Sequence, residues 1–371
     1  QVENEAALAD LVKGARDPFS VRGGGTRGMA PVGEPLSIAG LRGVTLYEPG
    51  ALTMVAQAGT PLEEIEAALH RENQRLAFEP MDHRDLLGTR GTPTIGGIFA
   101  ANVSGPRRIA VGAARDFLLG VRFVDGRGAI VKNGGRVMKN VTGYDLVKLM
   151  AGSFGTLGVL TEVSFKVLPR PETEATLMLH GLADAAAVPS LSRAMGSPFE
   201  VTGAAHDPAA GRTALRVEGF EASVVYRIRR LRELLADVGA EMDVAEEKAS
   251  RAYWAGQRDV SAFGDAEGDI WRVSCKPTEG PALSDTAGAE AHVFDWSGGL
   301  LWLRMAPGTD LRGRLGPFDG HATLVRSDPA TRARQGMFQP ETPGVAKLTA
   351  GLRAQFDPRG IFNARMMDQV A

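Results

Sequence analysis

Cysteine is almost absent from this sequence, which has a single one, Cys275, among its 371 residues. One cysteine cannot form a disulfide within the chain. It also cannot supply the several thiolates of a cysteine-rich metal site or of an iron–sulfur cluster. These three kinds of site are therefore excluded for this chain. A free cysteine is most often a small buried hydrophobic residue, and this is what we expect of Cys275.

Long apolar runs and a strong net charge are lacking too. No stretch approaches 18 apolar residues, and the start, QVENEAALADLV, is acidic where a signal peptide would be basic and then apolar. The formal net charge of -2 gives no overall attraction to nucleic acid or to an anionic membrane. The sequence predicts a cytoplasmic protein with no nucleic-acid partner and no direct membrane span. Peripheral association with the inner membrane through partner proteins stays open.

Glycine, in contrast, is abundant and unevenly placed. The 46 glycines crowd residues 21–50, residues 88–158 and the loops near Gly298. The run VRGGGTRG, Val21 to Gly28, sets glycines between two arginines. Glycine lets backbone N–H groups converge on an anion and arginine adds a charged fork of donors, so a phosphate is one interpretation. A flexible surface turn is the other. In the phosphate interpretation, we expect a Cβ at Gly24 to collide with phosphate oxygens.

Two further clusters of small residues follow, at 92–120 (TPTIGGIFAANVSGPRRIAVGAARDFLLG) and 140–162 (NVTGYDLVKLMAGSFGTLGVLTE). In the first of these, a threonine and two glycines precede a short apolar helical run, an arrangement that leaves backbone N–H groups facing an anion. The small residues beyond it leave room for a flat, bulky group. Three such clusters argue against a simple turn at Val21–Gly28.

Hydrophobic spacing predicts a mixed α+β fold. A helix over Glu5–Ala15 would bury Leu8, Leu11 and Val12, and a second helix would begin with Thr60 as its side-chain cap. Strands are expected at PFSVR, FLLGVRFV, GAIVKN and VLTEVSFKVLP. A later helix over 222–239 would bury Val225, Ile228, Leu231, Leu234 and Leu235. We find no internal repeat in the sequence, and the prolines of LPRPE, 168–172, mark a domain boundary.

The order of these motifs resembles the FAD-linked oxidases of the vanillyl-alcohol-oxidase type. The resemblance rests on TIGGIFAANVSG, GAARDFLLGVRFVDGRG, GYDLVKLMAGSFGTLGVLTEVSFKVLPRP and FDPRGIFN. Within that family, FEP, SGPRR and VMKNVTGYDLVKLMAGSFGTLGVLTE are most similar to the FAD-binding subunits of bacterial glycolate oxidases. The resemblance implies an α+β fold with a two-part FAD-binding domain of the PCMH type over 1–170. A smaller ferredoxin-like domain would cover 171–330, and 331–371 would form a C-terminal helix and a segment returning to the flavin domain.

The resemblance also implies which residues hold FAD. The first glycine loop would wrap the pyrophosphate, the second cluster would reach the pyrophosphate, the ribityl chain and the flavin, and the third would lie near the adenine. The residues are Arg22, Gly23, Gly24, Gly25, Thr26, Pro80, Thr94, Gly96, Gly97, Ala101, Ser104, Gly105, Gly112, Gly158, Val159 and Asn363. Relatives that bind flavin covalently use a histidine beside the first loop or an additional cysteine; here Gly24, Gly25 and Thr26 stand there. Non-covalent FAD is therefore expected.

The sequence departs from the family at several places. Where relatives that oxidise 2-hydroxy acids carry an HxGDGNxH-like metal segment, this chain reads FDGHATLVR with one histidine, His321, so no metal site is expected. Relatives usually have NPG where this chain has Asn363-Ala364-Arg365. The segment MDHRDLLGTRG, 81–91, has no firm counterpart; His83, Arg84 and Arg90 could cover the flavin, or the segment could be a solvated loop. Lys139 could be a cation near the flavin, or a surface residue.

The resemblance implies an FAD-dependent oxidoreductase acting on the CH–OH group of a small 2-hydroxy acid such as glycolate, with two electrons passing as a hydride equivalent to the flavin. Two hypotheses stay open. The chain is either a subunit beside a second FAD-containing subunit and an iron–sulfur subunit, or a self-sufficient dehydrogenase. The absent metal segment favours the first. Catalytic residues are left unassigned.

Overall fold

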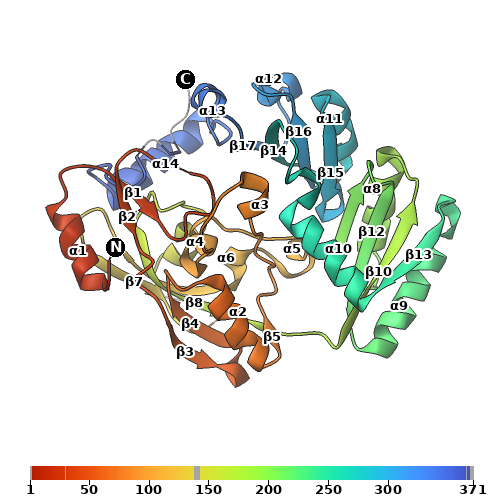
Figure 1. Cartoon of the computed structure of the whole chain (residues 1–371), viewed down its shortest axis with the longest axis horizontal. Coiled ribbons are helices and arrows are strands. Elements are labelled where there is room, and N and C mark those ends of the chain that lie inside the picture. Colours follow the sequence, from red (N-terminus) through yellow and green to blue (C-terminus); the bar gives the residue numbers. More distant parts are fainter. Residues whose placement is uncertain (1, 30, 138–142, 365, 368–371) are drawn as a thin grey trace. The chain divides into compact units, whose positions relative to one another are not determined.

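The computed structural model describes residues 2–29, 31–137, 143–364 and 366–367. The chain forms two compact units (Figure 1). The first comprises Gln1–Ser104, Gly112–Arg170 and Glu341–Asp368, and the second contains Gly105–Val111 and Pro171–Pro340. This division differs from the expected ranges in two places: residues 105–111 belong to the second unit, and the chain returns to the first unit at Glu341, not at residue 331.

The first unit is built on a five-stranded antiparallel sheet in the order β3-β4-β8-β6-β7. Its strands are β3 (Val44–Glu48), β4 (Thr53–Gln57), β6 (Leu118–Val124), β7 (Ile130–Gly134) and β8 (Val159–Lys166). Two small pairs accompany it: β1 (Phe19–Arg22) with β2 (Glu34–Ser37), and β5 (Gln74–Arg75) with β9 (Leu168–Pro169). The predicted strands at PFSVR, FLLGVRFV, GAIVKN and VLTEVSFKVLP are confirmed, and the hairpin joining β6 to β7 is formed across the expected turn.

Short helices surround this sheet. They are α1 (Glu5–Gly14), α2 (Leu62–Arg71), α3 (Arg84–Leu87), α4 (Ile95–Ala100), α6 (Ala114–Phe117), α7 (Leu146–Met150) and α14 (Pro343–Phe356), with the 3-10 turn η1 (Pro49–Ala51). Helix α1 buries Leu8 and Val12 as expected, but Leu11 is 44% exposed and Ala9 is buried instead. Thr60 does not cap α2. Its buried hydroxyl donates to the carbonyls of Gln57 and Gly43, and α2 begins without a side-chain cap.

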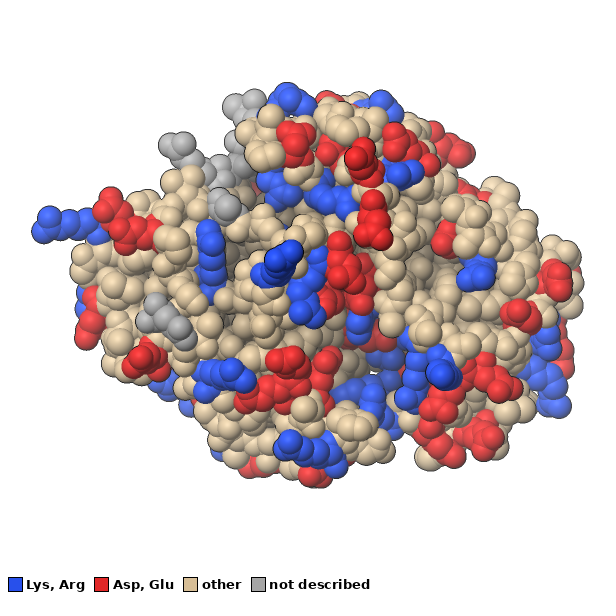
Figure 2. Space-filling model, viewed as in Figure 1, with Lys and Arg blue, Asp and Glu red and all other residues tan. Residues whose placement is uncertain are grey.

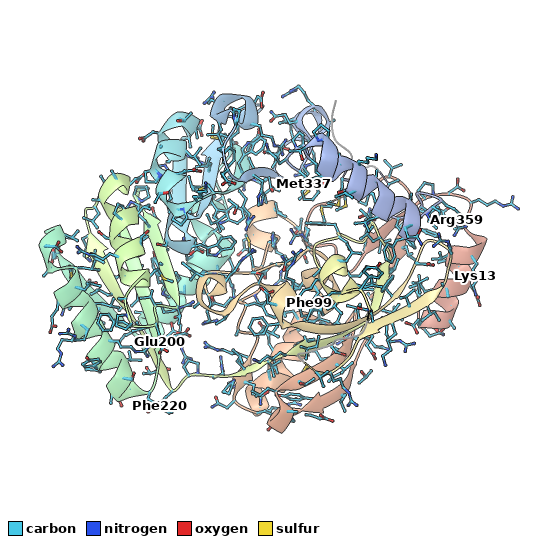
Figure 3. All side chains as sticks on the ribbon, turned by 180° about the vertical axis from the view of Figure 1, so that it is seen from behind. Lys13, Phe99, Glu200, Phe220, Met337 and Arg359 are labelled. Atoms are coloured by element: carbon cyan, nitrogen blue, oxygen red, sulfur yellow. The ribbon has the colours of Figure 1, made fainter. Side chains whose placement is uncertain are left out.

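Aromatic packing fixes α4 against the sheet. The ring centroid of Phe99, on α4, lies 5.6 Å from that of Phe78 and 5.4 Å from that of Phe165, on β8. All three rings are fully buried, and Figure 3 shows Phe99 within the first unit. Burial of a phenylalanine contributes about 1.5–3 kcal/mol. The helix that carries Thr94 and its glycines is thereby held in one position.

The C-terminal segment closes the first unit by joining β1. Phe19 donates its N–H to the carbonyl of Ile361 (2.6 Å), and Asn363 donates its N–H to the carbonyl of Phe19 (2.9 Å). Arg359 donates to the carbonyls of Val12 (2.5 Å) and Ala15 (3.1 Å) at the end of α1. Arg359 and the end of α1 therefore lie side by side, as the labels of Arg359 and Lys13 show in Figure 3. The positive charge of Arg359 at this position stabilises the C-terminal end of α1.

The second unit consists of one strand–helix–strand–strand–helix–strand arrangement formed twice. The first copy is β10 (Thr173–His180), α8 (Asp184–Met195), β11 (Gly203–Asp207), β12 (Arg212–Gly219), α9 (Glu221–Leu234) and β13 (Met242–Glu246). The second is β14 (Asp269–Ser274), α11 (Gly280–Ala287), β15 (Ala291–Asp295), β16 (Leu300–Met305), α12 (Leu311–Leu315) and β17 (His321–Arg326). Each copy has the ferredoxin-like strand order, and they join through β11 and β15 into an eight-stranded sheet, β13-β10-β12-β11-β15-β16-β14-β17. The sequence showed no such repeat.

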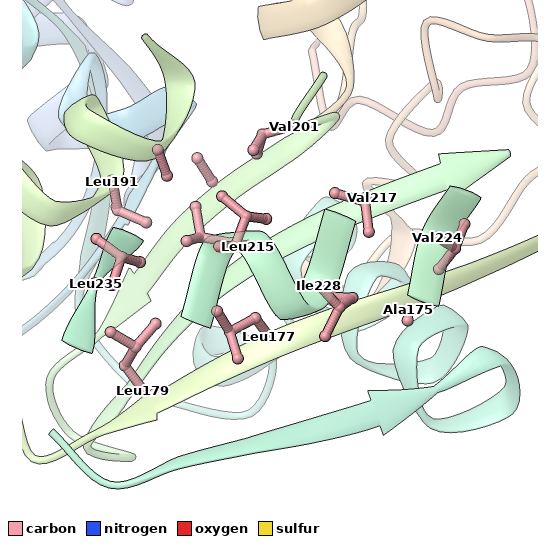
Figure 4. Close-up of a cluster of buried hydrophobic side chains, with 13 residues drawn as sticks. Ala175, Leu177, Leu179, Leu191, Val201, Leu215, Val217, Val224, Ile228 and Leu235 are labelled. Carbon is pink, nitrogen blue, oxygen red and sulfur yellow. The ribbon is translucent and has the colours of Figure 1, made fainter. Parts of the chain in front are cut away.

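The remaining elements of the second unit are α5 (Arg108–Val111), α10 (Glu247–Asp259), α13 (Pro329–Gln335) and the 3-10 turns η2 (Ala236–Val238), η3 (Ser261–Phe263), η4 (Pro277–Glu279) and η5 (Trp296–Gly298). Helices α8 and α9 cover one face of the first copy, where Leu177, Leu215 and Leu231 are fully buried (Figure 4). Trp254 of α10 packs with Met178, the neighbour of Leu177 along β10, and therefore covers the opposite face. Helix α9 buries Val224 and not the expected Val225, which is 65% exposed.

The surface carries charges of both signs. Figure 2 shows acidic and basic side chains interspersed over the face in view. Within the described residues, every helix is too short or too polar to cross a lipid bilayer.

Candidate functional site

One cavity in the first unit brings the three glycine clusters together. It contains ≈ 990 Å³ of empty space, part of it open to solvent. Of the predicted residues, those that line it are Arg22, Gly23, Gly24, Gly25, Thr26, Thr94, Gly96, Gly97, Ala101, Gly158, Val159 and Asn363. Residues more than 300 positions apart in the sequence therefore border the same space.

The first glycine loop follows β1 directly and is packed against the second cluster. A Cβ on Gly24 would lie 1.6 Å from the carbonyl oxygen of Thr92, and one on Gly23 would lie 2.4 Å from Oγ1 of Thr94. The expectation that a Cβ on Gly24 would point at the ligand is thus wrong: it would collide with backbone. Gly25 differs, since its φ is 70° and a Cβ there would meet no atom within 4 Å. Gly25 is the glycine of this loop that leaves space open.

The second cluster enters the site through the start of α4. Thr94 is the N-cap, and its hydroxyl accepts the N–H of Gly97 at 3.3 Å. A Cβ on Gly96 would lie 2.6 Å from Ala58, so this glycine permits close packing of α4 on the segment after β4. Gly97 has only the Thr94 hydroxyl near its Cβ position, at 3.2 Å. Gly96 therefore allows α4 to pack closely against its neighbour, whereas the absence of a side chain at Gly97 leaves space in the cavity.

Arg27 places a buried guanidinium in the cavity wall. Its Nε and Nη1 atoms are buried and have no hydrogen-bond partner among the residues that the structure describes. Burial lowers the pKa of its guanidinium to about 10, so that it still carries a charge at neutral pH. The group lies 5.6 Å from the ring centroid of Phe154, which also lines the cavity. A buried cation with unsatisfied donors costs free energy unless an anion reaches it.

Asn363 ties the third cluster to the first. Its side-chain oxygen accepts the N–H of Val21 at 2.7 Å, and its side-chain nitrogen donates to the carbonyl of Phe154 at 2.8 Å. Its backbone φ of 45° is left-handed, which asparagine tolerates better than most residues. The carbonyl of Asn363 accepts the N–H of Met366 at 3.1 Å, so a turn forms here without the family's proline and glycine.

Four predicted residues do not line the cavity: Pro80, Ser104, Gly105 and Gly112. Ser104 accepts the N–H of Ala114 at 2.9 Å through its hydroxyl. Gly105 belongs to the second unit, where its carbonyl accepts the indole N–H of Trp296 at 3.2 Å. Gly112 has a φ of 94°, and a Cβ there would lie 2.9 Å from the carboxylate of Asp116, which caps α6. Pro80 is buried beside the cavity-lining Met81.

The segment without a family counterpart, 81–91, contributes part of the wall. His83 is buried and lines the cavity, with Nδ1 3.2 Å from the carbonyl oxygen of Met81. Arg84 and Arg90 are exposed, and Arg84 pairs with Asp82 at 2.6 Å. The open question of this segment is thus answered residue by residue: the histidine reaches the cavity and the two arginines face solvent. Lys139 lies outside the described residues.

Arg27 and Phe154 are among the wall residues that sequence reasoning missed, and His83 was named there only as one of two alternatives. Arg27 stands in the quoted run VRGGGTRG, and its position beside four glycines was the available signal. Phe154 offered no such signal, because a phenylalanine among small residues is usually a buried core residue. Its φ of 53° shows that the backbone turns sharply there.

The remaining chemically notable residues lie in the second unit. Cys275 is half-buried, and burial raises the pKa of its thiol to about 12, so it stays a thiol at neutral pH. Desolvation and the charges of Arg272 and Arg108 lower the pKa of His321, at the start of β17. Over the described part of the chain, no three histidine, cysteine or acidic side chains come close enough together to hold a metal ion.

Known proteins that are similar to this chain include FAD-binding proteins. The FAD-binding domain family model matches residues 1–134. The Escherichia coli glycolate oxidase subunit GlcE is 34% identical over 357 residues, covering 95% of this chain and 93% of its own. This chain belongs to the GlcE family. The predicted family and the cofactor, FAD, are confirmed.

Other relatives match parts of the chain. The Bacillus subtilis glycolate oxidase subunit GlcD is 45% identical over 95 residues, 25% of this chain and 20% of its own. The D-2-hydroxyglutarate dehydrogenase of Xanthomonas citri is 34% identical over 194 residues, 52% of this chain and 35% of its own. The chain is an FAD-linked oxidoreductase of the family that acts on 2-hydroxy acids.

Solved structures show the same fold. An alkyldihydroxyacetonephosphate synthase superimposes with a TM-score of 0.70 at 17% identity, covering 98% of this chain and 76% of that one. The VAO-type flavoprotein from Myceliophthora thermophila gives a TM-score of 0.65 at 13% identity, with 97% and 77% coverage. The predicted α+β fold of the vanillyl-alcohol-oxidase type is confirmed.

Proposed function

We propose that this chain is the FAD-binding subunit of a glycolate, or 2-hydroxy-acid, oxidase complex. The observation that carries the proposal is the cavity in which three glycine clusters meet the buried Arg27, in a chain similar to GlcE along 95% of its length. The relatives that are named as subunits, GlcE and GlcD, support an assembly of several chains. In this proposal the partners are a second FAD-containing subunit and an iron–sulfur subunit.

The residues of the cavity suit the anionic part of FAD. Gly25 offers a stretch of backbone with no side chain in the way, and Arg27 offers two buried donors. We propose that both face the diphosphate, with Thr26 and the N-terminal turn of α4 beside them. When bound, FAD accepts two electrons from a substrate and passes them on. The protein residues hold the cofactor, neutralise its charge and exclude water from it.

Non-covalent binding is part of this proposal. Gly24, Gly25 and Thr26 stand where a covalently attached histidine would be, and Cys275 belongs to the second unit. Acid precipitation of the purified protein should therefore release a yellow supernatant. Colour retained in the pellet would contradict non-covalent binding, and His83, the histidine of the cavity wall, would then be the residue to examine.

The partners can be tested by reduction of the flavin without oxygen. We expect glycolate or D-lactate to leave the absorbance of the FAD-loaded chain unchanged when it is alone. Bleaching should appear when the other subunits are added, and the native protein should co-purify with two further polypeptides, one flavoprotein and one carrying clusters. Rapid bleaching of the isolated chain would contradict the proposal and support a self-sufficient dehydrogenase. We also propose that the complex lies in the cytoplasm, held at the inner membrane, if at all, through its partners.

A further inference from the structure

Phe154 brings an aromatic ring to the buried cation of the cavity. The guanidinium carbon of Arg27 lies 5.6 Å from the centroid of the Phe154 ring, and both residues line the cavity. A cation within about 6 Å of a ring centroid is attracted by the quadrupole of the ring. This attraction uses the charge of the guanidinium and none of its N–H donors, so Nε and Nη1 of Arg27 stay without a partner among the described residues. The ring therefore holds the cation while these donors remain available to a ligand.

The backbone at Phe154 has a conformation that a phenylalanine rarely adopts. Its φ is 53°, and that of the following Gly155 is 72°. The left-handed region suits glycine and is unfavourable for a bulky residue. A phenylalanine at this position strains the backbone and at the same time places a ring in the cavity wall. Strain of this kind persists where the surrounding structure enforces it, often at ligand sites.

Hydrogen bonds from two other segments hold this strained residue in place. Phe154 donates its N–H to the carbonyl of Ala100 at the end of α4, at 2.8 Å, and its own carbonyl accepts the side-chain N–H of Asn363, also at 2.8 Å. Asn363 in turn accepts the N–H of Val21, in β1, at 2.7 Å. The peptide groups on both sides of Phe154 are thus fixed, and with them the direction in which its side chain leaves the backbone.

Arg27 gains from a fixed neighbour, because its side chain is long and has several rotatable bonds. A guanidinium that moves among many positions loses conformational entropy when a ligand orders it, and this loss opposes binding. A guanidinium already held over a ring loses less. The contact with Phe154 therefore favours binding of an anion at Arg27 without itself touching the anion.

We infer that Phe154 is a positioning residue for the cofactor, whose ring holds the Arg27 guanidinium where its buried donors meet the anionic part of the ligand. The chain that fixes this arrangement runs from α4 and Asn363 through the backbone of Phe154 to its ring, and from the ring to Arg27. That the anion is the diphosphate of FAD rests on the proposed function; the pairing of the ring with the cation does not.

A double-mutant cycle on the full chain tests this role by equilibrium titration of the apoprotein with FAD. Phe154→Leu removes the ring but keeps most of the side-chain volume, and we expect it to weaken FAD binding about three- to tenfold while Arg27 is present. In the Arg27→Gln background the same change should weaken binding less than about twofold. Phe154→Tyr keeps the ring face and should restore nearly normal affinity. The matched control is Ile38→Val, in another apolar residue of the cavity, whose effect should be equal in both backgrounds.

Two further measurements separate positioning from folding. Phe154→Gly removes the ring at a φ that glycine adopts freely, so it should weaken FAD binding as Phe154→Leu does and leave the circular dichroism unchanged. In NMR spectra of the apoprotein, the ring should shift the Nε–H signal of Arg27, which is identified by its loss in Arg27→Gln. This shift should disappear in Phe154→Leu.

Equal weakening of FAD binding by Phe154→Leu with and without Arg27 would overturn the inference, because the ring would then act on FAD or on the fold directly. Normal FAD affinity in both Phe154→Leu and Phe154→Gly would overturn it as well. These measurements follow FAD binding and not turnover, so failure of the assembled complex to reduce its flavin with glycolate would count against the proposed function alone.

Discussion

The two units of this protein differ in how strictly their structures constrain the residue at each position. In the first, close backbone contacts require glycine at particular positions: Gly24 lies against the carbonyl of Thr92, and Gly96 lies against Ala58. In the second, the same six-element arrangement forms twice from sequences with no visible repeat. A sheet covered by helices requires only apolar residues at alternate positions, which many sequences satisfy. A loop that wraps a ligand requires particular backbone contacts, which few sequences satisfy.

The largest effect is expected where a backbone contact is broken. Gly24→Val places a Cβ 1.6 Å from the Thr92 carbonyl oxygen, so the first glycine loop and the segment before α4 cannot keep their present approach. We expect FAD binding to be lost and the melting temperature of the first unit to fall, measured by FAD titration and calorimetry. Gly351→Val, on exposed α14 with open space around its Cβ position, is the control. Normal FAD affinity in Gly24→Val would show that the loop does not form the site.

A core truncation in the second unit should lower stability and leave FAD binding unchanged. Leu215, on β12, is fully buried within the cluster between the sheet and helices α8 and α9. Leu215→Ala should lower the free energy of unfolding by about 2–5 kcal/mol. FAD affinity should stay unchanged, because Leu215 belongs to the other unit. The exposed Val225→Ala should change stability by less than about 0.5 kcal/mol. Loss of FAD from Leu215→Ala would show that FAD binding in the first unit depends on the packing of the second.

The contrast also explains what the sequence could predict. The strands followed from alternating residues, because this pattern encodes backbone conformation directly. The cofactor and twelve of the residues that line the cavity were implied by the family resemblance that the glycine clusters carry. Ser104, Gly105 and Gly112 do not line the cavity, and a small residue serves a cap or a tight turn as readily as a ligand, as Gly112 does beside Asp116. The paired ferredoxin-like halves could not be read from the sequence, since the pairing of β11 with β15 joins strands far apart in the chain.

Arg27 separates ligand binding from stability within the first unit. Arg27→Gln removes a buried charge whose Nε and Nη1 lack partners among the described residues, so the apoprotein should be as stable as the wild type or more stable. FAD should bind about ten- to a hundredfold more weakly, the usual cost of one charge-assisted hydrogen bond or two. Equilibrium titration and urea unfolding measure the two effects. Arg22→Gln, at the exposed arginine of the same loop, is the control and should change FAD affinity less. A destabilised apoprotein with normal FAD affinity would assign Arg27 a purely structural role.

The smallest expected effect is a difference in pH dependence between the units. Burial alone would raise the pKa of Glu5, but hydrogen bonds from Arg122 and Thr161 outweigh it and hold the pKa below its ordinary value. Burial raises the pKa of Glu174 on β10, although the Ser250 hydroxyl donates to it at 2.7 Å.

The signs of the two contributions are opposite. The stability that Glu5 contributes is present above the ordinary carboxyl pKa and is lost as the pH falls through its lowered value. The contribution of Glu174 is greatest at low pH and is lost as the pH rises through its raised value. Glu5→Gln should therefore destabilise the protein at pH 7 and much less in acid, whereas Glu174→Gln should stabilise it at pH 7 and change little in acid. Urea unfolding at pH 4 and pH 7 measures both variants, and the same sign for the two at pH 7 would contradict the prediction. Because Glu5 joins α1 to the sheet of the first unit and Glu174 lies within the second, acid should weaken the flavin unit first.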